Sequence, residues 1–210
     1  MLTIFGRQVL TGAKVLLVFT LLLGLAYPLA MVLFAKAMPA QDSSIRNAAG
    51  EVVGSSHIAQ PVSGDRWFFP RPSAGDYDGL ASGASNLATT NPELVAMIED
   101  RRAKIAVREN ADPASIPADA LTSSASGLDP DISPEYARLQ VIRVARETGL
   151  SQKEVESMVE ANTHQPLLGF IGEPRVNVVT LNNDLANSGT ADRSSTADRS
   201  STANRSSGEH

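Results

Sequence analysis

The sequence has no cysteine and only three histidines in 210 residues. Without cysteine, the chain cannot form disulfides, thiolate zinc sites, iron–sulfur clusters or a cysteine nucleophile. His210 is the last residue, and His57 and His164 lie far apart, so a metal site would have to be assembled from distant parts of the chain. We therefore predict no metal site.

Local motifs for nucleotide binding and catalysis are also missing. The sequence contains neither GxxxxGK(S/T) nor GxGxxG, which hold nucleotide phosphates, and neither GxSxG nor SxxK, which mark activated serines. A triad of Ser126, Asp129 and a histidine stays open, because triads are defined by geometry. Asp129 and Asp131 resemble the start of a calcium loop but lack its later ligands, which favours turn capping. We predict no catalytic residue and assign no cofactor-binding residue.

Acidic residues are missing from the first 38 positions, whose charged side chains are Arg7, Lys14 and Lys36. Residues 187–210 carry three arginines and three acids. Removing both segments from the totals of 18 basic and 23 acidic residues leaves 12 basic and 20 acidic residues in 39–186, a net charge of −8. A nucleic-acid binder needs a basic face that neutralises phosphates, so we expect no nucleic-acid partner.

An uncharged run from Val15 to Ala35 predicts one helix across a membrane. At 1.5 Å per residue this run spans about 31 Å, close to the ~30 Å of bilayer hydrocarbon. The alternative is a cleaved signal peptide, since Ala35-Lys36-Ala37 offers a cleavage pattern, but the apolar region of a signal peptide is only ~7–15 residues long. We therefore predict an uncleaved anchor at 15–35. The positive-inside rule places residues 1–14 in the cytoplasm and the acidic piece outside it.

Small residues lie on one side of this predicted span. Thr20, Gly24 and Pro28 are spaced by four and share a helix face, and small residues at such spacing let another membrane helix approach closely. Gly24 also leaves room for the ring of Pro28. Ala26 and Ala30 offer a rival face, and Gly and Pro are common in membrane helices in any case. Thr20, Gly24 and Pro28 are thus candidate contacts to a partner helix, and the rival face stays open.

The C-terminal residues 190–207 repeat one hexapeptide three times, as TADRSS, TADRSS and TANRSS. Alanine is the only apolar residue of the repeat, whereas a β-helical repeat would need larger side chains facing inward. The composition predicts a solvated, disordered tail over residues 187–210.

Three helices are predicted from their N-terminal capping residues, two of which precede a proline at the first helical position. The third cap forms a capping box with Glu154. Gly149 ends the second helix, so the second and third helices should form a tight hairpin. The caps are Asn91, Ser133 and Ser151, and the predicted helices cover 92–109, 134–148 and 152–162.

Strand signals are short. Residues 175–181 (RVNVVTL) alternate β-branched and polar side chains and predict a strand, and residues 50–53 with 57–58 predict a small hairpin. Residues 71–86 and 121–131 are dense in Gly, Ser, Pro, Asn and Asp and predict loops. The predicted fold class is α+β: one N-terminal transmembrane helix, a mixed helix-and-strand extracytoplasmic domain over residues 39–186, and the disordered tail.

A series of short motifs follows in fixed order along the chain. They are WFFPRPSA from Trp67, SGASNL from Ser82, NP at Asn91, LTSSASGLD from Leu121, ISP at Ile132, the helix with Gln140 and RVA from Arg143, and GEPRVNVVTLN from Gly172. In this order and spacing, residues 15 to about 186 resemble the C subunit of the Kdp potassium-transporting ATPase, the KdpC family. One departure is Ile58-Ala59-Gln60, where the family usually has glycine in the middle, and it concerns the backbone near Gln60.

The resemblance implies a non-catalytic, single-pass subunit of a potassium pump in the inner membrane. The partners it implies are a channel-like subunit that passes K⁺, a P-type subunit that hydrolyses ATP, a small single-span subunit, and membrane lipid. ATP and K⁺ are then used by the complex. The family is also described as a catalytic chaperone that raises the ATP affinity of the hydrolysing subunit. The residues alone leave open a membrane-anchored or secreted extracytoplasmic hydrolase or binding protein.

Eight polar residues of the motif segments are candidate structural or partner-contact residues. They lie on the predicted helices or where turns meet helices and strands, so we expect them to serve architecture and docking rather than chemistry. Arg175 is expected to clamp a carboxylate within the fold or on a partner. The eight are Arg71, Asn86, Ser126, Asp129, Gln140, Arg143, Arg175 and Asn177.

Overall fold

The computed structural model describes residues 2–38, 42–47 and 49–188, which divide into two compact units at Asp42 and Ser43. The predicted tail lies outside the described residues from position 189 onward, whereas residues 187 and 188 end the last helix.

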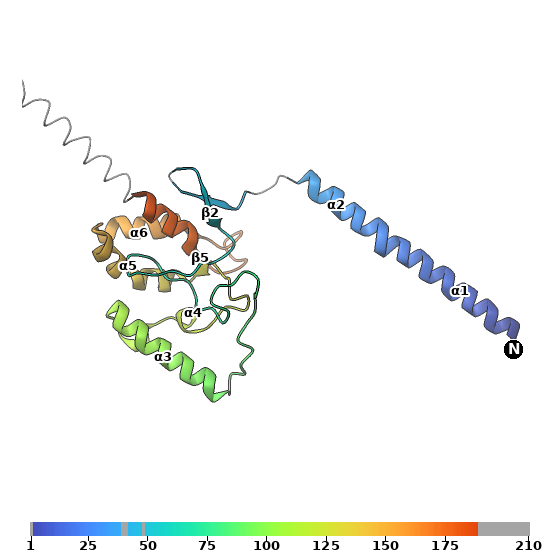
Figure 1. Ribbon diagram of the computed structural model, residues 1–210, viewed down its shortest axis with the longest axis horizontal. Coiled ribbons are helices and arrows are strands. Elements are labelled where there is room, and N and C mark those ends of the chain that lie inside the picture. Colours follow the sequence, from blue (N-terminus) through green and yellow to red (C-terminus); the bar gives the residue numbers. More distant parts are fainter. Residues whose placement is uncertain (1, 39–41, 48, 189–210) are drawn as a thin grey trace, which may run out of the picture. The chain divides into compact units, whose positions relative to one another are not determined.

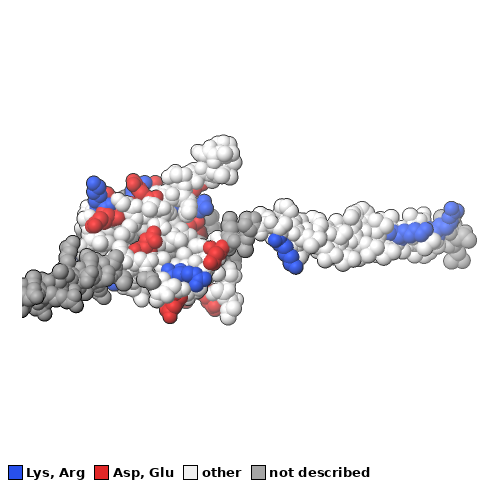
Figure 2. Space-filling view, turned by 90° about the horizontal axis from the view of Figure 1, so that it is seen from above, with Lys and Arg blue, Asp and Glu red and all other residues white. Residues whose placement is uncertain are grey.

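The first unit is one helical rod (Figure 1). Helix α1 (Leu2–Leu21) continues into a π-helical turn, η1 (Leu22–Ala26), and then into α2 (Tyr27–Ala37). Within the described residues, only the stretch Phe5–Ala37 is long and apolar enough to cross a membrane, and it contains the predicted span 15–35. Figure 2 shows charged side chains near the ends of this rod and an uncharged surface between them.

Pro28 explains the wide turn in the rod. Proline has no N–H, and its ring clashes with the carbonyl one turn earlier. The turn relieves this clash, because Tyr27 N–H donates to the carbonyl of Leu22, five residues back instead of four. Such π-bulges are a known response of helices to local strain. Gly24 lies inside the turn, but a Cβ there would meet only Thr20 Cγ2, at 4.0 Å, so the expectation that glycine is needed to make room for the ring is wrong.

The second unit is a mixed fold of helices and small antiparallel sheets (Figure 1). Strands β1 and β2 form a hairpin, and the other sheet has the order β3–β5–β4. The predicted α+β class is confirmed. The strands are β1 (Ser44–Arg46), β2 (Val52–Ser55), β3 (Asp131–Ile132), β4 (Thr163–His164) and β5 (Arg175–Asn177).

The three helices predicted from their caps are confirmed as α3 (Pro92–Glu109), α5 (Pro134–Thr148) and α6 (Gln152–Ala161). Each capping side chain accepts a backbone N–H of the first turn, and Ser151 with Glu154 forms both bonds of the capping box. Helix α5 packs against α6, as expected for a hairpin, and also against α3. Two shorter elements, η2 (Pro113–Ser115) and α4 (Ala118–Leu121), connect α3 to β3.

The hydrophobic core lies where α5, α6, β5 and the last helix, residues 178–188, meet. One face of α5 supplies Ala137, Val141 and Val144 at helical spacing, and Gln140 is buried among them. Phe68, from an irregular segment, is fully buried in the same core.

The predicted strand at 175–181 is wrong beyond Asn177. Strand β5 ends there, and residues 178–188 are helical. Asn177 Oδ1 accepts the N–H groups of Val179 and Thr180, both at 3.1 Å, and so caps a new helix. Val178 and Leu181 then face the core at helical spacing, and this burial outweighs the strand preference of the valines.

The predicted hairpin has the wrong partner. Val52 and Val53 do lie in a strand, but β2 pairs with residues 44–46 instead of residues 57–58. The turn between the strands is built on Asn47, whose Oδ1 accepts the N–H groups of Ala49 and Glu51 at 3.0 and 2.9 Å. This side-chain turn, which sequence reasoning missed, sets the pairing.

Candidate functional site

A buried ion network joins α3 to α5. Arg143 and Glu109 are almost fully buried, and Arg143 Nε donates to both carboxylate oxygens of Glu109 at 3.1 and 2.9 Å. Arg108 Nε reaches the same carboxylate at 2.7 Å, and its Nη2 donates to the hydroxyl of Tyr136 at 3.1 Å. Burial raises the pKa of Tyr136, so this hydroxyl stays neutral. Two arginines thus neutralise one buried carboxylate, which makes its burial tolerable.

Two side-chain amides hold the backbone of the WFFPRPSA motif. Gln140 Oε1 accepts the N–H of Phe69 at 2.8 Å, and its Nε2 donates to the carbonyl of Phe69 at 3.2 Å. Asn182 makes the same pair of bonds with Phe68, each at 2.9 Å. The segment is irregular, yet both residues have their backbone groups paired, as buried backbone requires. Gln140 and Asn182 therefore act as a clamp on the motif.

Arg143 completes the clamp. Its Nη1 donates to the carbonyl of Asp65 and, at 3.0 Å, to the carbonyl of Trp67, while its Nη2 donates to Gln140 Oε1 at 2.9 Å. The ring of Phe69 lies 5.1 Å from the guanidinium of Arg143 and 4.0 Å from that of Arg108. One arginine thereby couples the ion network to the motif.

The two predicted loops pair with each other. Arg71 Nη1 lies 3.2 Å from Asp129 Oδ2, and Gly83 N–H donates to the carbonyl of Ser126 at 2.9 Å. Gly127 has a φ of +70°, and a Cβ there would lie 3.0 Å from the carbonyl oxygen of Gly83, so only glycine fits comfortably. The signature sequences that looked like separate loops therefore form one packed surface.

The side chains of Ser126 and Asp129 stabilise turns by accepting backbone hydrogen bonds. Ser126 Oγ accepts the N–H of Leu128 at 3.1 Å, and Asp129 Oδ1 accepts the N–H of Asp131 at 3.0 Å. The hydrogen bonds found for both side chains within the described residues go to the backbone or to Arg71, and none goes to a histidine. Nor do the described residues contain a group of three His, Asp or Glu placed to hold a metal ion.

Arg175 forms an ion pair with a carboxylate of the fold. Its Nε lies 2.8 Å from Asp131 Oδ2, and about half of the Arg175 side chain stays exposed. Burial raises the pKa of Asp131, and the neighbouring Arg175 opposes that shift. The pair lies in an open, mostly acidic groove whose other charged residues are Arg71, Asp119, Asp129, Glu135 and Glu173.

Asn86 and Asn177 lie where the backbone changes direction: Asn86 in a left-handed conformation, and Asn177 between strand β5 and the last helix. Asn86 is exposed and has a φ of +54°, a left-handed conformation that asparagine tolerates better than most residues. Asn177, besides capping the last helix, donates from Nδ2 to the carbonyl of Ser56 at 2.7 Å. It thereby ties that helix to the segment after the β1–β2 hairpin.

Thr20, Gly24 and Pro28 lie in the helical rod, and their side chains are exposed within that unit. A Cβ added at Gly24 would meet Thr20 Cγ2 at 4.0 Å and nothing nearer. Thr20 and Gly24 are therefore neighbours on the rod, as the spacing predicted.

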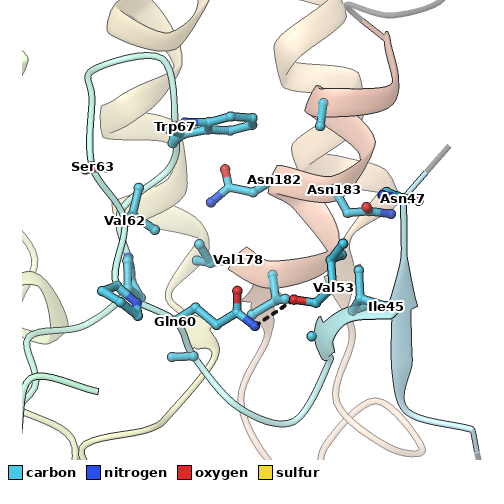
Figure 3. Close-up of a pocket in the computed structure, with 16 residues that line it drawn as sticks. Ile45, Asn47, Val53, Gln60, Val62, Ser63, Trp67, Val178, Asn182 and Asn183 are labelled. Atoms are coloured by element: carbon cyan, nitrogen blue, oxygen red, sulfur yellow. Dashed lines mark hydrogen bonds between the residues drawn. The ribbon is translucent and has the colours of Figure 1, made fainter. Parts of the chain in front are cut away.

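A cavity of about 390 Å³ lies between the β1–β2 hairpin and the last helix (Figure 3). Trp67 lies at one end, and Asn182 and Asn183 line the wall formed by the helix. Gln60 donates from Nε2 to the carbonyl of Val53 at 3.2 Å across the other end. Among the residues that the structure describes, none that lines the cavity is charged, so this lining offers no cation to a phosphate group.

Ala59 occupies the position where the family usually has glycine. It is buried, and its N–H donates to the carbonyl of Leu128 at 2.9 Å. It is not among the described residues with positive φ, so alanine is accommodated without backbone strain.

The sequence did not reveal the partners of the predicted residues. Arg143 and Gln140 were named, but Glu109 was read only as the end of a helix, and Asn182 only as the end of a motif. Charged or amide side chains next to predicted core positions are the signal that could have found them, because such groups need buried partners.

These features define a class of protein: within the described residues, a chain with one long apolar helix and a separate folded unit whose polar motif residues bond within the fold. Comparison with known proteins identifies the family. Residues 9–187 match the KdpC family model, described as K⁺-transporting ATPase, c chain.

Three similar proteins carry the name potassium-transporting ATPase KdpC subunit. The Kineococcus radiotolerans protein is 48% identical over 184 residues, 86% of this chain and 94% of the relative. The Caulobacter vibrioides protein is 49% identical over 172 residues, 80% and 86% of the two chains. The Xanthomonas oryzae pv. oryzae protein is 42% identical over 186 residues, 87% and 89% of the two chains. The chain therefore belongs to the KdpC family, the accessory subunits of the Kdp potassium-uptake ATPase, and the resemblance noted in the sequence is confirmed.

Proposed function

We propose that this chain stabilises the assembly of the pump without taking part in its chemistry. Its partners are the channel-like subunit, the P-type ATP-hydrolysing subunit and the small single-span subunit, with membrane lipid around the helix. The observation that carries the proposal is the clamp. The WFFPRPSA motif is held by hydrogen bonds from the side chains of Arg143, Gln140 and Asn182. These bonds make the folded unit a rigid scaffold.

The test compares membranes that contain the other three subunits with and without this chain. We expect the channel-like and ATP-hydrolysing subunits to co-purify in one complex only when the chain is present. Equal recovery of that complex without the chain would contradict an assembly role.

We further propose that residues 1–14 are cytoplasmic, residues 15–35 span the inner membrane, and residues 39–186 with the tail 187–210 lie outside the cytoplasm. Arg7 and Lys14 before the span support this orientation by the positive-inside rule. The absence of cysteine makes the test simple. In intact spheroplasts, a membrane-impermeant maleimide should label the Lys153→Cys variant and spare Gln8→Cys. The reverse pattern, or a mature chain that begins at Met38, would contradict this topology.

A finer part of the proposal is that the chain raises the ATP affinity of the hydrolysing subunit. With the folded unit outside the cytoplasm, the effect would pass through the membrane helix, and the uncharged cavity beside Trp67 gives no reason to invoke direct phosphate binding. The face with Thr20, Gly24 and Pro28 supplies the helix contact. The measurement is the KM for ATP of complexes that carry wild-type chain or a Gly24 variant. A raised KM at unchanged turnover supports the role, and identical KM values contradict it.

A further inference from the structure

Residues 167–171 (LLGFI) form an apolar knob on the second unit. Leu167 and Ile171 exchange both backbone hydrogen bonds, at 3.0 and 2.9 Å, and close a tight hairpin. Its four large side chains are poorly covered: Leu167 is 68% exposed, Leu168 and Phe170 are 76% exposed, and Ile171 is 50% exposed. Four adjacent exposed side chains of this size make a contiguous patch of the kind that marks an interaction site.

The turn of the knob pairs two further backbone N–H groups within itself. Gly169 N–H donates to the carbonyl of Pro166 at 3.0 Å, and Phe170 N–H donates to the carbonyl of Leu167 at 3.3 Å. Because the turn pairs the N–H groups of Gly169 and Phe170 internally, burying these two groups in an interface leaves neither of them without an acceptor.

The turn also fixes the direction of its side chains. Leu168 has a φ of +55° and Gly169 a φ of +82°. Left-handed backbone is unfavourable for leucine, whereas asparagine or glycine would adopt it easily. A strained residue at an exposed tip points to a use for its side chain, because strain of this kind persists where function needs it.

We propose that the knob docks into an apolar pocket on another subunit of the pump, with Leu168 and Phe170 as its anchors. This inference rests on the assembly role proposed above and names a surface that performs it. Aromatic and large apolar anchors in well-packed pockets carry most of the energy of protein interfaces. A rigid turn also loses little conformational entropy on binding, which favours a fitted protein pocket.

The observations favour a protein over the lipid bilayer as the occupant. Segments that insert into membrane surfaces usually carry Lys or Arg, which anionic headgroups attract. Residues 165–172 contain no charge, and residues 39–186 have a net charge of −8. The basic residue that follows, Arg175, is already paired with Asp131.

The first experiment compares Leu168→Asn and Phe170→Thr with Val107→Gln, a control on α3 whose side chain is 84% exposed. We expect the first two variants to lower the recovery of assembled complex at least tenfold and the control to leave it unchanged. The melting temperature of the purified full-length chain should stay the same or rise for Leu168→Asn, since asparagine relieves the strain. Wild-type recovery for both knob variants would overturn the proposal.

The rate at which a single cysteine on the knob reacts with a maleimide supplies a second measurement, which does not depend on the stability of the anchor variants. Leu167→Cys keeps both anchors and provides the chain's single thiol, and Val107→Cys is the matched control. We expect Leu167→Cys to react with a soluble maleimide at least tenfold more slowly in the assembled complex than in the chain alone in lipid vesicles, with no change for the control. Equal rates would overturn the docking, and protection already present in vesicles would assign the knob to the bilayer and overturn the protein partner.

Failure of this proposal and failure of the assembly role are distinguishable. If the complex forms without the chain, the assembly role is wrong. If the complex requires the chain but tolerates the knob variants and leaves Leu167→Cys reactive, only the knob assignment is wrong.

Discussion

Arg143 and Glu109, 34 residues apart, form a buried pair in which one N–H of the arginine is shared by both carboxylate oxygens. The same guanidinium also holds the backbone carbonyls of Asp65 and Trp67. The pair thus fixes two helices and the WFFPRPSA motif at one point. A buried ion pair contributes little net stability, but removing Arg143 leaves Glu109 with Arg108 alone and leaves the carbonyls of Asp65 and Trp67 without their donor.

Arg143→Met should therefore lower the free energy of unfolding by about 3–5 kcal/mol. The measurement is urea unfolding of the full-length chain in detergent, followed by fluorescence of the single tryptophan, Trp67. Arg138→Met is the matched control on the same helix, because Arg138 and Glu135 are 3.8 Å apart and exposed. Its cost should stay below about 1 kcal/mol. Equal costs for the two variants would contradict the assigned role of Arg143.

The two amide side chains of the clamp should protect different backbone groups. Gln140→Leu should speed hydrogen exchange at the amide of Phe69, and Asn182→Leu should speed it at the amide of Phe68, because each variant removes the acceptor of that N–H. Each variant serves as the control for the other. The loss of stability should be about 1–3 kcal/mol for each backbone group left unpaired. Unchanged exchange at both amides would show that these bonds do not hold the motif.

The elements predicted correctly from the sequence depend on local signals. Asn91, Ser133 and Ser151 act on the turn that follows them, so α3, α5 and α6 could be placed from a few neighbouring residues. The strand at 175–181 was over-extended because valines favour strands locally, whereas the helix there is set by the cap at Asn177 and by core burial.

Some residues of the site were named as candidates from the sequence, but their partners within the fold were not. Arg71 and Asp129 were both named from motifs, yet their pairing joins segments 58 residues apart. Asn182 and Phe68, which sequence reasoning did not connect, are 114 residues apart. Such pairings follow from the packing of the whole unit, and no local pattern encodes them.

The two roles of the Asn177 side chain, the helix cap and the hydrogen bond to Ser56, can be tested separately. Asn177→Asp keeps an acceptor for the N–H groups of Val179 and Thr180 but loses the donor to Ser56, whereas Asn177→Ala loses both. Asn177→Ala should destabilise the chain by about 1 kcal/mol more than Asn177→Asp. The measurement is thermal unfolding at pH 7, and identical melting temperatures for the two variants would refute the cap.

Gly24 tests the helix face. A Cβ at this position meets only Thr20 Cγ2 at 4.0 Å, so Gly24→Leu should leave the helical rod intact by itself. In the complex, the larger side chain should force a partner helix away and lower the recovery of assembled pump. Ala26→Leu on the rival face is the control and should do less. Equal recovery of both variants would contradict the claimed face, and a larger loss for Ala26→Leu would assign the contact to the other side.

The central claim is that the polar motif residues serve assembly and not chemistry, and the most direct measurement is K⁺-dependent ATP hydrolysis per assembled complex for Asp129→Ala and Arg175→Ala. Asp129 pairs with Arg71 and Arg175 pairs with Asp131, so each change breaks one ion pair of the scaffold. We predict a lower yield of complex and, for the complex that does assemble, turnover within about twofold of wild type, because a loss of orders of magnitude is expected only for groups that stabilise the transition state. Normal assembly combined with such a loss of turnover would contradict the claim.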